Sequence, residues 1–112
     1  MLFGNKIKQL RSERGVLQRE LASLLEIDMP MMCKIERGER RAKRKHVVLL
    51  ANYFHVDENE MLAIWLADKV LNSINDEDND EIKEAALKIA QCAFYQDRQA
   101  GSMGIEFGYD NQ

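Results

Sequence analysis

Residues 18–38, QRELASLLEIDMPMMCKIERG, constrain the fold of this 112-residue chain more than any other stretch. Leucines at 21, 24 and 25, with Ala22 beside them, recur at helical spacing, so a short amphipathic helix is expected from Gln18 onward. A tight turn containing Glu26 follows this helix. Apolar and polar residues do not alternate one by one here, as they would in a half-buried strand.

A second short helix is expected directly after the turn. Asp28 is a residue type that caps helices by accepting a hydrogen bond from an orphan amide. Pro30 would then lie in the first turn, where its missing N–H costs nothing. Gly38 follows where helices often end on a left-handed residue. Two short helices joined by such a turn fit a DNA major groove, and an ordinary pair of core helices is the alternative.

Charge is distributed unequally along the chain. The net charge is −3, but residues 1–56 hold 12 basic and 6 acidic residues (+6), whereas residues 57–112 hold 4 basic and 13 acidic residues (−9). The basic half concentrates its charge after the second short helix, in Lys34, Arg37, Arg40, Arg41, Lys43, Arg44 and Lys45. This cluster favours contact with phosphates, and a solvated basic loop is the alternative.

The remaining apolar spacing also predicts helices, with no strand signal, so the fold class is all-α. A first helix would bury Phe3, Ile7 and Leu10 and stop near Gly15. A fourth helix is marked by Val47, Leu50, Ala51 and Phe54. The chain can bury only a modest core at this length, and one main domain over residues 1–74 is expected.

Two more helices are expected in the acidic half. Asp57 and Glu60 resemble a capping box for a fifth helix that runs to residue 74. A turn rich in Asp and Asn leads to a sixth helix within residues 75–100, with one face formed by Ile82, Ala86, Ile89 and Ala93. Residues 101–112 contain three glycines and read as a mobile or irregularly docked tail.

The fifth helix is apolar almost all round over MLAIWLA, residues 61–67. A helix at the edge of a small domain needs only one apolar face. The second face must be covered by the sixth helix, by a partner chain, or by both. We expect a homodimer in which the helix of residues 75–100 takes part, since most soluble oligomers are two-fold.

The string CKIERGER at residues 33–40, with the pattern before it, resembles the Cro/phage-repressor (XRE-like) helix-turn-helix family over roughly residues 3–66. The resemblance implies a lambda-repressor-like five-helix DNA-binding domain, here with an extra C-terminal helix. It implies that Gln18 contacts a phosphate. It also implies a buried pair between Arg11 and Glu36.

The same resemblance assigns positions to a double-stranded DNA partner. The positions that would face DNA are Asp28, Met29, Pro30, Cys33, Lys34 and Arg37. The basic cluster adds Arg40, Arg41, Lys43 and Arg44 as phosphate contacts.

Three features depart from the family pattern. The turn carries Glu26 where glycine is usual, so a residue with a side chain would need a positive φ. Leu17 stands where a Ser or Thr cap is usual. Met29 and Pro30 cannot hydrogen-bond to base edges, which leaves thymine methyls and, through Lys34, guanine as the readable features.

Other chemistry finds little support. His46 and His55 lack metal-ligand partners at suitable spacing and read as surface or helix-end residues. The acidic turn lacks the glycine and the final glutamate of a calcium loop. Cys33 and Cys92 form no CxxC pair and indicate reduced thiols in a cytoplasm, with a redox role for Cys33 as a minor alternative. No catalytic constellation is present, so neither an enzyme, a cofactor nor a metal is expected.

No apolar run reaches membrane-spanning length, and no secretory signal segment is recognisable, so no membrane partner is expected. The sequence therefore predicts a cytoplasmic, sequence-specific DNA-binding transcriptional regulator that acts as a homodimer. The alternative is an antitoxin-type or other protein-interaction module, with weak or no specific DNA readout, whose acidic C-terminal half grips a basic protein.

Overall fold

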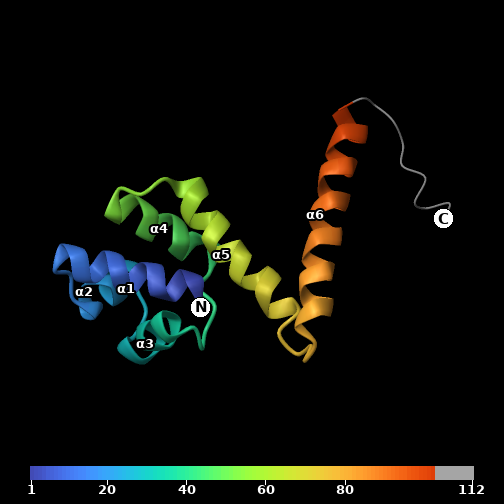
Figure 1. The fold of residues 1–112 in the computed structure, drawn as a ribbon. Helices are drawn as coiled ribbons and strands as arrows, with labels where there is room; N and C mark the ends of the chain where they lie inside the picture. Colours follow the sequence, from blue (N-terminus) through green and yellow to red (C-terminus); the bar gives the residue numbers. More distant parts are fainter. Residues whose placement is uncertain (103–112) are drawn as a thin grey trace. The chain divides into compact units, whose positions relative to one another are not determined.

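The computed structural model describes the backbone of residues 1–102 and the side chains of residues 1–98. This part of the chain contains six α-helices and no strand (Figure 1). The helices are α1 (Leu2–Arg14), α2 (Gln18–Leu25), α3 (Met29–Arg37), α4 (Arg44–Phe54), α5 (Glu58–Ser73) and α6 (Asp80–Ser102). The last helix extends two residues into the predicted tail, and residues 103–112 lie outside the described part.

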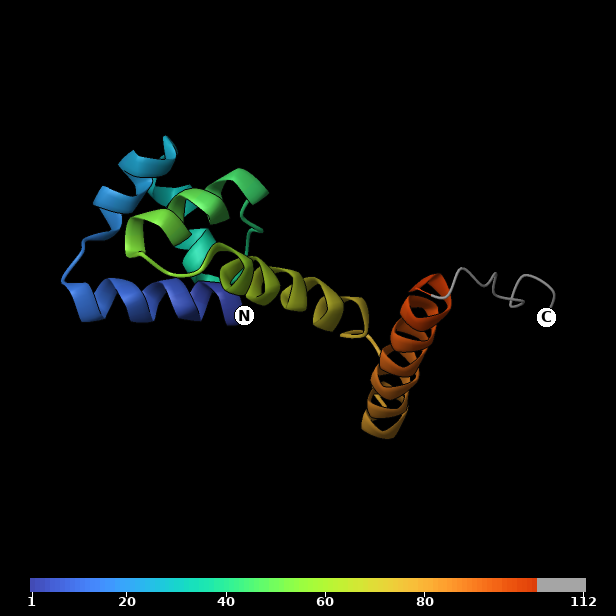
Figure 2. The same cartoon turned by 90° about the horizontal axis from the view of Figure 1, so that it is seen from above.

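The chain divides into two compact units, Met1–Ser73 and Ile74–Gln112, and each is considered by itself. In the first unit α1 packs against α3 and α5, α2 packs against α3 and α4, and α4 packs against α5. Seen from above, α1 runs along one side of this unit (Figure 2). The most deeply buried side chains come from all five helices: Ile7, Leu21, Met32, Val47, Leu50, Phe54 and Met61.

The ends of the helices follow local sequence signals closely. Gly15 and Gly38 end α1 and α3 in the left-handed region, with φ of 66° and 77°. Glu26 takes the same role after α2 with φ 57°, so the strain of a left-handed glutamate is accepted in this turn. Asp28 Oδ1 accepts a hydrogen bond from the Met31 amide at 2.9 Å, as its position predicts. Leu17 caps α2 without any side-chain hydrogen bond.

The N-terminus of α1 is capped from a distant helix. The Leu2 and Phe3 amides donate to the two carboxylate oxygens of Asp68 on α5, at 2.8 and 2.9 Å. Asp68 is only 4% exposed. These bonds satisfy two of the orphan amides of α1 and fasten the beginning of α1 to α5.

Helix α1 also lies unusually close to α3. A Cβ added at Gly4 would come within 2.5 Å of the Glu36 carbonyl oxygen, a distance that no real side chain tolerates. Gly4 is therefore needed for this contact, which sets the position of α3 relative to the rest of the core.

The two histidines differ from each other. His55 is exposed at the C-terminal end of α4, as expected, and has a positive φ of 58°. His46 was expected on the surface or at a helix end, and it does lie in the first turn of α4, but it is buried. Its Nδ1 has no hydrogen-bond partner. Burial lowers the pKa of His46, and the charges of Lys45 and Lys43 lower it further.

The predicted capping box of α5 forms in one direction, since Asp57 Oδ2 accepts a bond from the Glu60 amide at 2.9 Å. In the second unit Asn79 Oδ1 accepts bonds from the Glu81 and Ile82 amides at the beginning of α6. Among residues 1–102, no helix is long and apolar enough to cross a membrane.

Candidate nucleic-acid interface

Helix α3 presents two distinct faces. Met32 and Ile35 are buried in the core. Met29, Pro30 and Lys34 are exposed on the other side of the helix. The beginning of this exposed side is apolar, because Met29 has 40% of its surface accessible and Pro30 has no donor. Lys34, near the middle of the helix, is exposed and able to donate hydrogen bonds.

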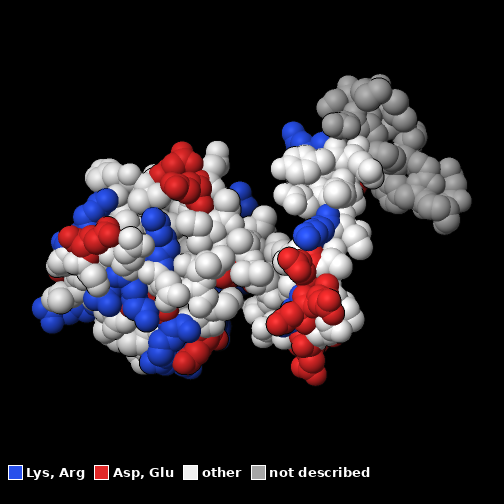
Figure 3. Space-filling view, in the orientation of Figure 1, with Lys and Arg blue, Asp and Glu red and all other residues white. Residues whose placement is uncertain are grey.

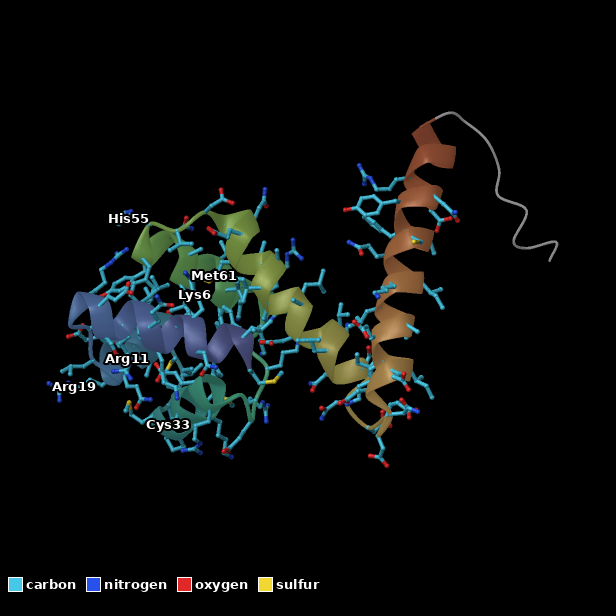
Figure 4. All side chains as sticks on the ribbon, in the orientation of Figure 1. Lys6, Arg11, Arg19, Cys33, His55 and Met61 are labelled. Carbon is cyan, nitrogen blue, oxygen red and sulfur yellow. The ribbon has the colours of Figure 1, made fainter. Side chains whose placement is uncertain are left out.

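A buried ion pair connects α1 to the rear of α3. Arg11 Nε and Nη2 donate to the two carboxylate oxygens of Glu36, at 2.9 and 3.1 Å. The Glu36 side chain is 2% exposed and that of Arg11 22%. Figure 4 shows Arg11 on the side of α1 toward α3, the helix that carries Cys33. Such a bidentate pair holds α3 at a defined orientation on α1.

Gln18, at the beginning of α2, extends this network to the exposed side of α3. Its Nε2 donates to Glu36 Oε1 at 2.9 Å, and its Oε1 accepts from the Cys33 thiol at 3.3 Å. The amide group carries two N–H bonds, of which this network uses one. The second is available for the phosphate contact that the resemblance implies. Cys33 is half-buried and, like Cys92, a free thiol.

Two of the expected DNA-contacting arginines have partners within the chain. Arg37 forms a bidentate pair with Glu39, at 2.8 and 3.1 Å, and both side chains are about half exposed. The pairing raises the pKa of Arg37 and lowers that of Glu39, so both remain charged around neutral pH. A phosphate would have to compete with the Glu39 carboxylate for this guanidinium.

Arg41 is engaged by Trp65 of α5. Its guanidinium lies over the indole ring, 4.1 Å from the ring centroid, and its Nη1 donates to the Trp65 carbonyl at 3.0 Å. The Trp65 indole in turn donates to the Ala42 carbonyl at 2.8 Å. Arg41 and Trp65 together therefore attach the loop between α3 and α4 to α5. The guanidinium of Arg41 is engaged in this attachment and is not a free charge.

The remaining cations of the cluster are exposed and have no ion pair with a described side chain. They are Lys34, Arg40, Lys43, Arg44 and Lys45. Lys43 is the N-cap of α4 and makes no side-chain capping bond, so the first amides of α4 lie beside these charges. Lys and Arg side chains gather on the side of the first unit where α3 lies (Figure 3). The set combines a positive helix end with free cations, which suits phosphate groups.

The arrangement of α2, the turn and α3 agrees with the comparison with known proteins. A family model described as a helix-turn-helix domain matches residues 2–64, which is more than half of the chain. The chain belongs to this helix-turn-helix domain family. Searches of curated proteins and of solved structures found no match.

Helix-turn-helix domains place their second helix in the DNA major groove, so duplex DNA is the partner that this family assignment indicates. In this chain α3 is the second helix of the motif. No group of three or more His, Cys, Asp or Glu side chains that could hold a metal is found among the described residues.

The sequence did not predict the roles of three residues that shape the first unit: Trp65, Asp68 and Gly4. Trp65, with its polar N–H, lies inside the apolar run of residues 61–67, and the charged Asp68 directly follows this run. Their presence at that place is a signal for a specific partner, but the sequence alone does not name the partner.

Proposed function

We propose that this helix-turn-helix protein is a sequence-specific, DNA-binding transcriptional regulator of the Cro/phage-repressor-like kind. In this proposal the five helices of residues 1–73 are arranged as in lambda repressor, and the protein acts in the cytoplasm as a homodimer, without cofactor or enzymatic activity. The observation that carries the proposal is the exposed side of α3, which lies directly beside the free cations of the α3–α4 loop.

Sequence readout is assigned to the beginning and middle of α3. Lys34 would donate to guanine O6 and N7 in the major groove. Met29 and Pro30 would contact thymine methyl groups, since neither can hydrogen-bond to a base edge. The half-site is therefore expected to contain a thymine next to a guanine.

The homodimer supplies the two-fold symmetry of the site. In a two-fold pair the recognition helices would lie roughly 34–36 Å apart, one turn of DNA, and the operator would be palindromic. Such spacing allows each copy to place its own α3 in successive major grooves on the same side of the duplex.

Selection of bound sequences from a random duplex library, with the full chain, tests the proposal. We expect enrichment of a palindrome whose half-sites contain the thymine–guanine step. The Lys34→Ala variant should lose about 1–3 kcal/mol on the selected site and much less on random DNA. Met29→Gln should change the preference at one base pair. Equal losses on both DNAs would make Lys34 a phosphate contact only and contradict the assigned readout.

The antitoxin-type interaction module remains the second candidate, and the apolar exposed start of α3 favours it. Exposed Met29 next to Pro30 is more usual on a protein-binding surface than on a base-reading helix. A library selection that enriches no sequence would support this candidate, with the acidic C-terminal half as the surface for a basic protein.

A further inference from the structure

Helix α6 carries an apolar surface that is too wide for a solitary helix. Ile82, Ile89 and Phe94 are 53%, 69% and 56% exposed. At 3.6 residues per turn, the alanines at 85, 86, 90 and 93 fall on the same broad arc as these side chains. The opposite side of the helix carries the charged residues Glu81, Glu84 and Lys88.

This surface needs a partner. In proteins, most of the stability of an amphipathic helix comes from packing of its apolar face against a neighbour. The described part of the second unit, residues 74–102, contains α6 and the turn before it, and no second helix. No second helix of residues 74–102 therefore covers this apolar surface.

We propose that α6 pairs with α6 of a second copy of this chain, in antiparallel orientation, with the two-fold axis close to Ile89. The proposal deepens the homodimer of the proposed function and depends on it. It assigns the interface to one face of one helix and fixes the direction of the two helices.

The apolar pattern of α6 is close to self-complementary about Ile89. Ala86 lies three residues before this position and Ala93 four residues after it. In an antiparallel pair Ala86 therefore lies opposite the partner's Ala93, once on each side of the axis. Small residues on both sides of the axis let the two backbones approach closely, while Ile89 fills the centre by packing against its own copy.

The distribution of charge favours the antiparallel direction over the parallel one. Acidic residues gather at and just before the beginning of α6: Asp76, Glu77, Asp78, Asp80, Glu81 and Glu84. Figure 3 shows this negative surface at the beginning of the helix. A parallel pair would bring the two acidic helix beginnings together at one end of the dimer, where their like charges repel, whereas an antiparallel pair places them at opposite ends. In the antiparallel pair the two Glu81 positions are separated by roughly 24 Å along the helix axis.

Antiparallel pairing also brings opposite charges together. Lys83 lies six residues before Ile89 and Asp97 eight residues after it, both on the side of α6 that carries Ala90. Each Lys83 would thus lie beside the partner's Asp97, which gives two equivalent ion pairs. Within its own helix, Lys83 Nζ lies 3.8 Å from the Asp80 carboxylate, a long contact.

Disulfide trapping in the full chain tests the direction and the centre of the pair. Both native thiols are first replaced (Cys33→Ser and Cys92→Ser), and single cysteines are then introduced under mild oxidation. Ile89→Cys should form an interchain disulfide readily, because residues on the axis lie opposite their own copies. Ile82→Cys should not, since its two copies are separated by roughly 21 Å, far beyond disulfide reach. A mixture of Ile82→Cys and Gln96→Cys chains should form the mixed disulfide.

Each other pattern overturns the proposal. Efficient trapping of both Ile89→Cys and Ile82→Cys would indicate a parallel pair. Trapping of none of them, in a protein that light scattering shows to be dimeric at tens of micromolar, would place the interface elsewhere. A monomeric full chain would remove the dimer altogether and leave α6 for a different partner. Fluorescence anisotropy with duplex DNA, measured on the same samples, shows separately whether DNA binding survives.

A charge exchange gives a second test that does not depend on introduced cysteines. Lys83→Glu and Asp97→Lys should each weaken dimerisation several-fold, and the double variant should restore it. Glu84→Lys, on the opposite side of α6, is the control and should leave the dimer dissociation constant within twofold. Additive weakening in the double variant would contradict the antiparallel register.

Discussion

At the scale of single residues, Glu36 has the most demanding environment in the first unit. Its buried carboxylate accepts two bonds from Arg11 and one from Gln18. Removal of one member of a buried pair leaves the other charge without compensation, which typically costs about 3–5 kcal/mol. We expect Glu36→Ala to lower the free energy of unfolding by this amount, as measured by urea denaturation.

Glu39→Ala is the matched control, because Glu39 also pairs with an arginine through two hydrogen bonds but in solvent. Exposed pairs contribute little to stability. This variant should unfold close to the wild-type urea midpoint, and it should bind DNA somewhat more tightly because it frees Arg37. Equal destabilisation by the two substitutions would show that burial of the Glu36 pair has no energetic consequence.

His46 should make stability depend on pH in a defined direction. Because burial lowers the pKa of His46 below its ordinary value of 6.5, the unfolded chain binds its proton more readily than the folded chain. The contribution of buried, neutral His46 to the free energy of unfolding is then fully present above about pH 6.5. It is lost as the pH falls from there towards the lowered pKa of the folded state. The charged residues that line the same surface pocket as His46 are Lys43, Lys45 and Glu26.

Thermal unfolding between pH 7.5 and pH 5.5 measures this effect. The wild-type melting temperature should fall across this range, and His46→Phe should flatten the dependence. His55→Gln, at an exposed histidine, should leave the slope as it is in the wild type. A slope that survives in His46→Phe would assign the proton to another group.

Residues whose role is local were predictable from sequence, and residues whose role depends on distant partners were not. Asp28 and Gly38 act on backbone atoms within three or four positions, so their types and places were sufficient. Asp68 binds amides 65 and 66 positions away, and nothing in its neighbourhood indicates them. His46 is a different case: it lies four residues before Leu50 and eight before Phe54, so helical spacing does place it on the buried face of α4, although its polar type favours the surface.

At the scale of elements, the loop between α3 and α4 owes its position to α5. The Trp65 indole donates to the Ala42 carbonyl, and Arg41 lies over the indole ring. Trp65→Phe keeps an aromatic ring in place but removes the N–H donor. We expect it to weaken binding to duplex DNA roughly two- to tenfold, in keeping with the loss of one hydrogen bond that orders the cationic loop.

The matched control for Trp65→Phe is Tyr53→Phe, which also removes one polar group from an aromatic side chain, on the exposed side of α4. It should leave DNA affinity within error of the wild type. Anisotropy titrations at one salt concentration compare the two variants. If Trp65→Phe binds DNA as the wild type does, the loop keeps its position without this bond, and Arg41 should be reconsidered as a free phosphate contact.

The order and the approximate ends of the helices followed from apolar spacing and capping residues, because these signals act within a few turns. These local signals did not predict which cations of the basic cluster have partners within the chain. Arg37 and Arg41 belong to the same basic run as Arg40 and Arg44, yet one pairs with Glu39 and the other with Trp65. Which members of a charge cluster remain free depends on tertiary neighbours, so the candidate site could be located but not resolved from sequence.

At the scale of the whole molecule, the chain separates its charges into a basic and an acidic half. A net charge of −3 would by itself disfavour association with DNA, so binding must depend on the local field around α3 and the loop after it. At physiological ionic strength charges are screened beyond about 8 Å, which lets a basic surface act although the chain is acidic overall.

The position of the cations, and not the net charge of the chain, should therefore decide the affinity for DNA. Reversal of three free cations beside α3, in the triple variant Arg40→Glu, Lys43→Glu and Arg44→Glu, should weaken binding to all duplex sequences alike. With six to ten phosphate contacts, wild-type affinity should fall on the order of a thousandfold or more between 50 and 200 mM salt. In the triple variant the slope of log affinity against log salt should be reduced by about 1 for each lost phosphate contact.

The matched control is the triple variant Lys8→Glu, Lys69→Glu and Lys88→Glu, which changes the net charge by the same amount. These lysines are exposed and lie on α1, α5 and α6, outside the cluster of residues 34–45. If DNA binding is local, the control should keep the wild-type salt slope and lose affinity only slightly, through the weaker long-range field. Equal losses of DNA affinity in the two triple variants would mean that binding depends only on the total charge of the chain. The surface around α3 would then not be the interface.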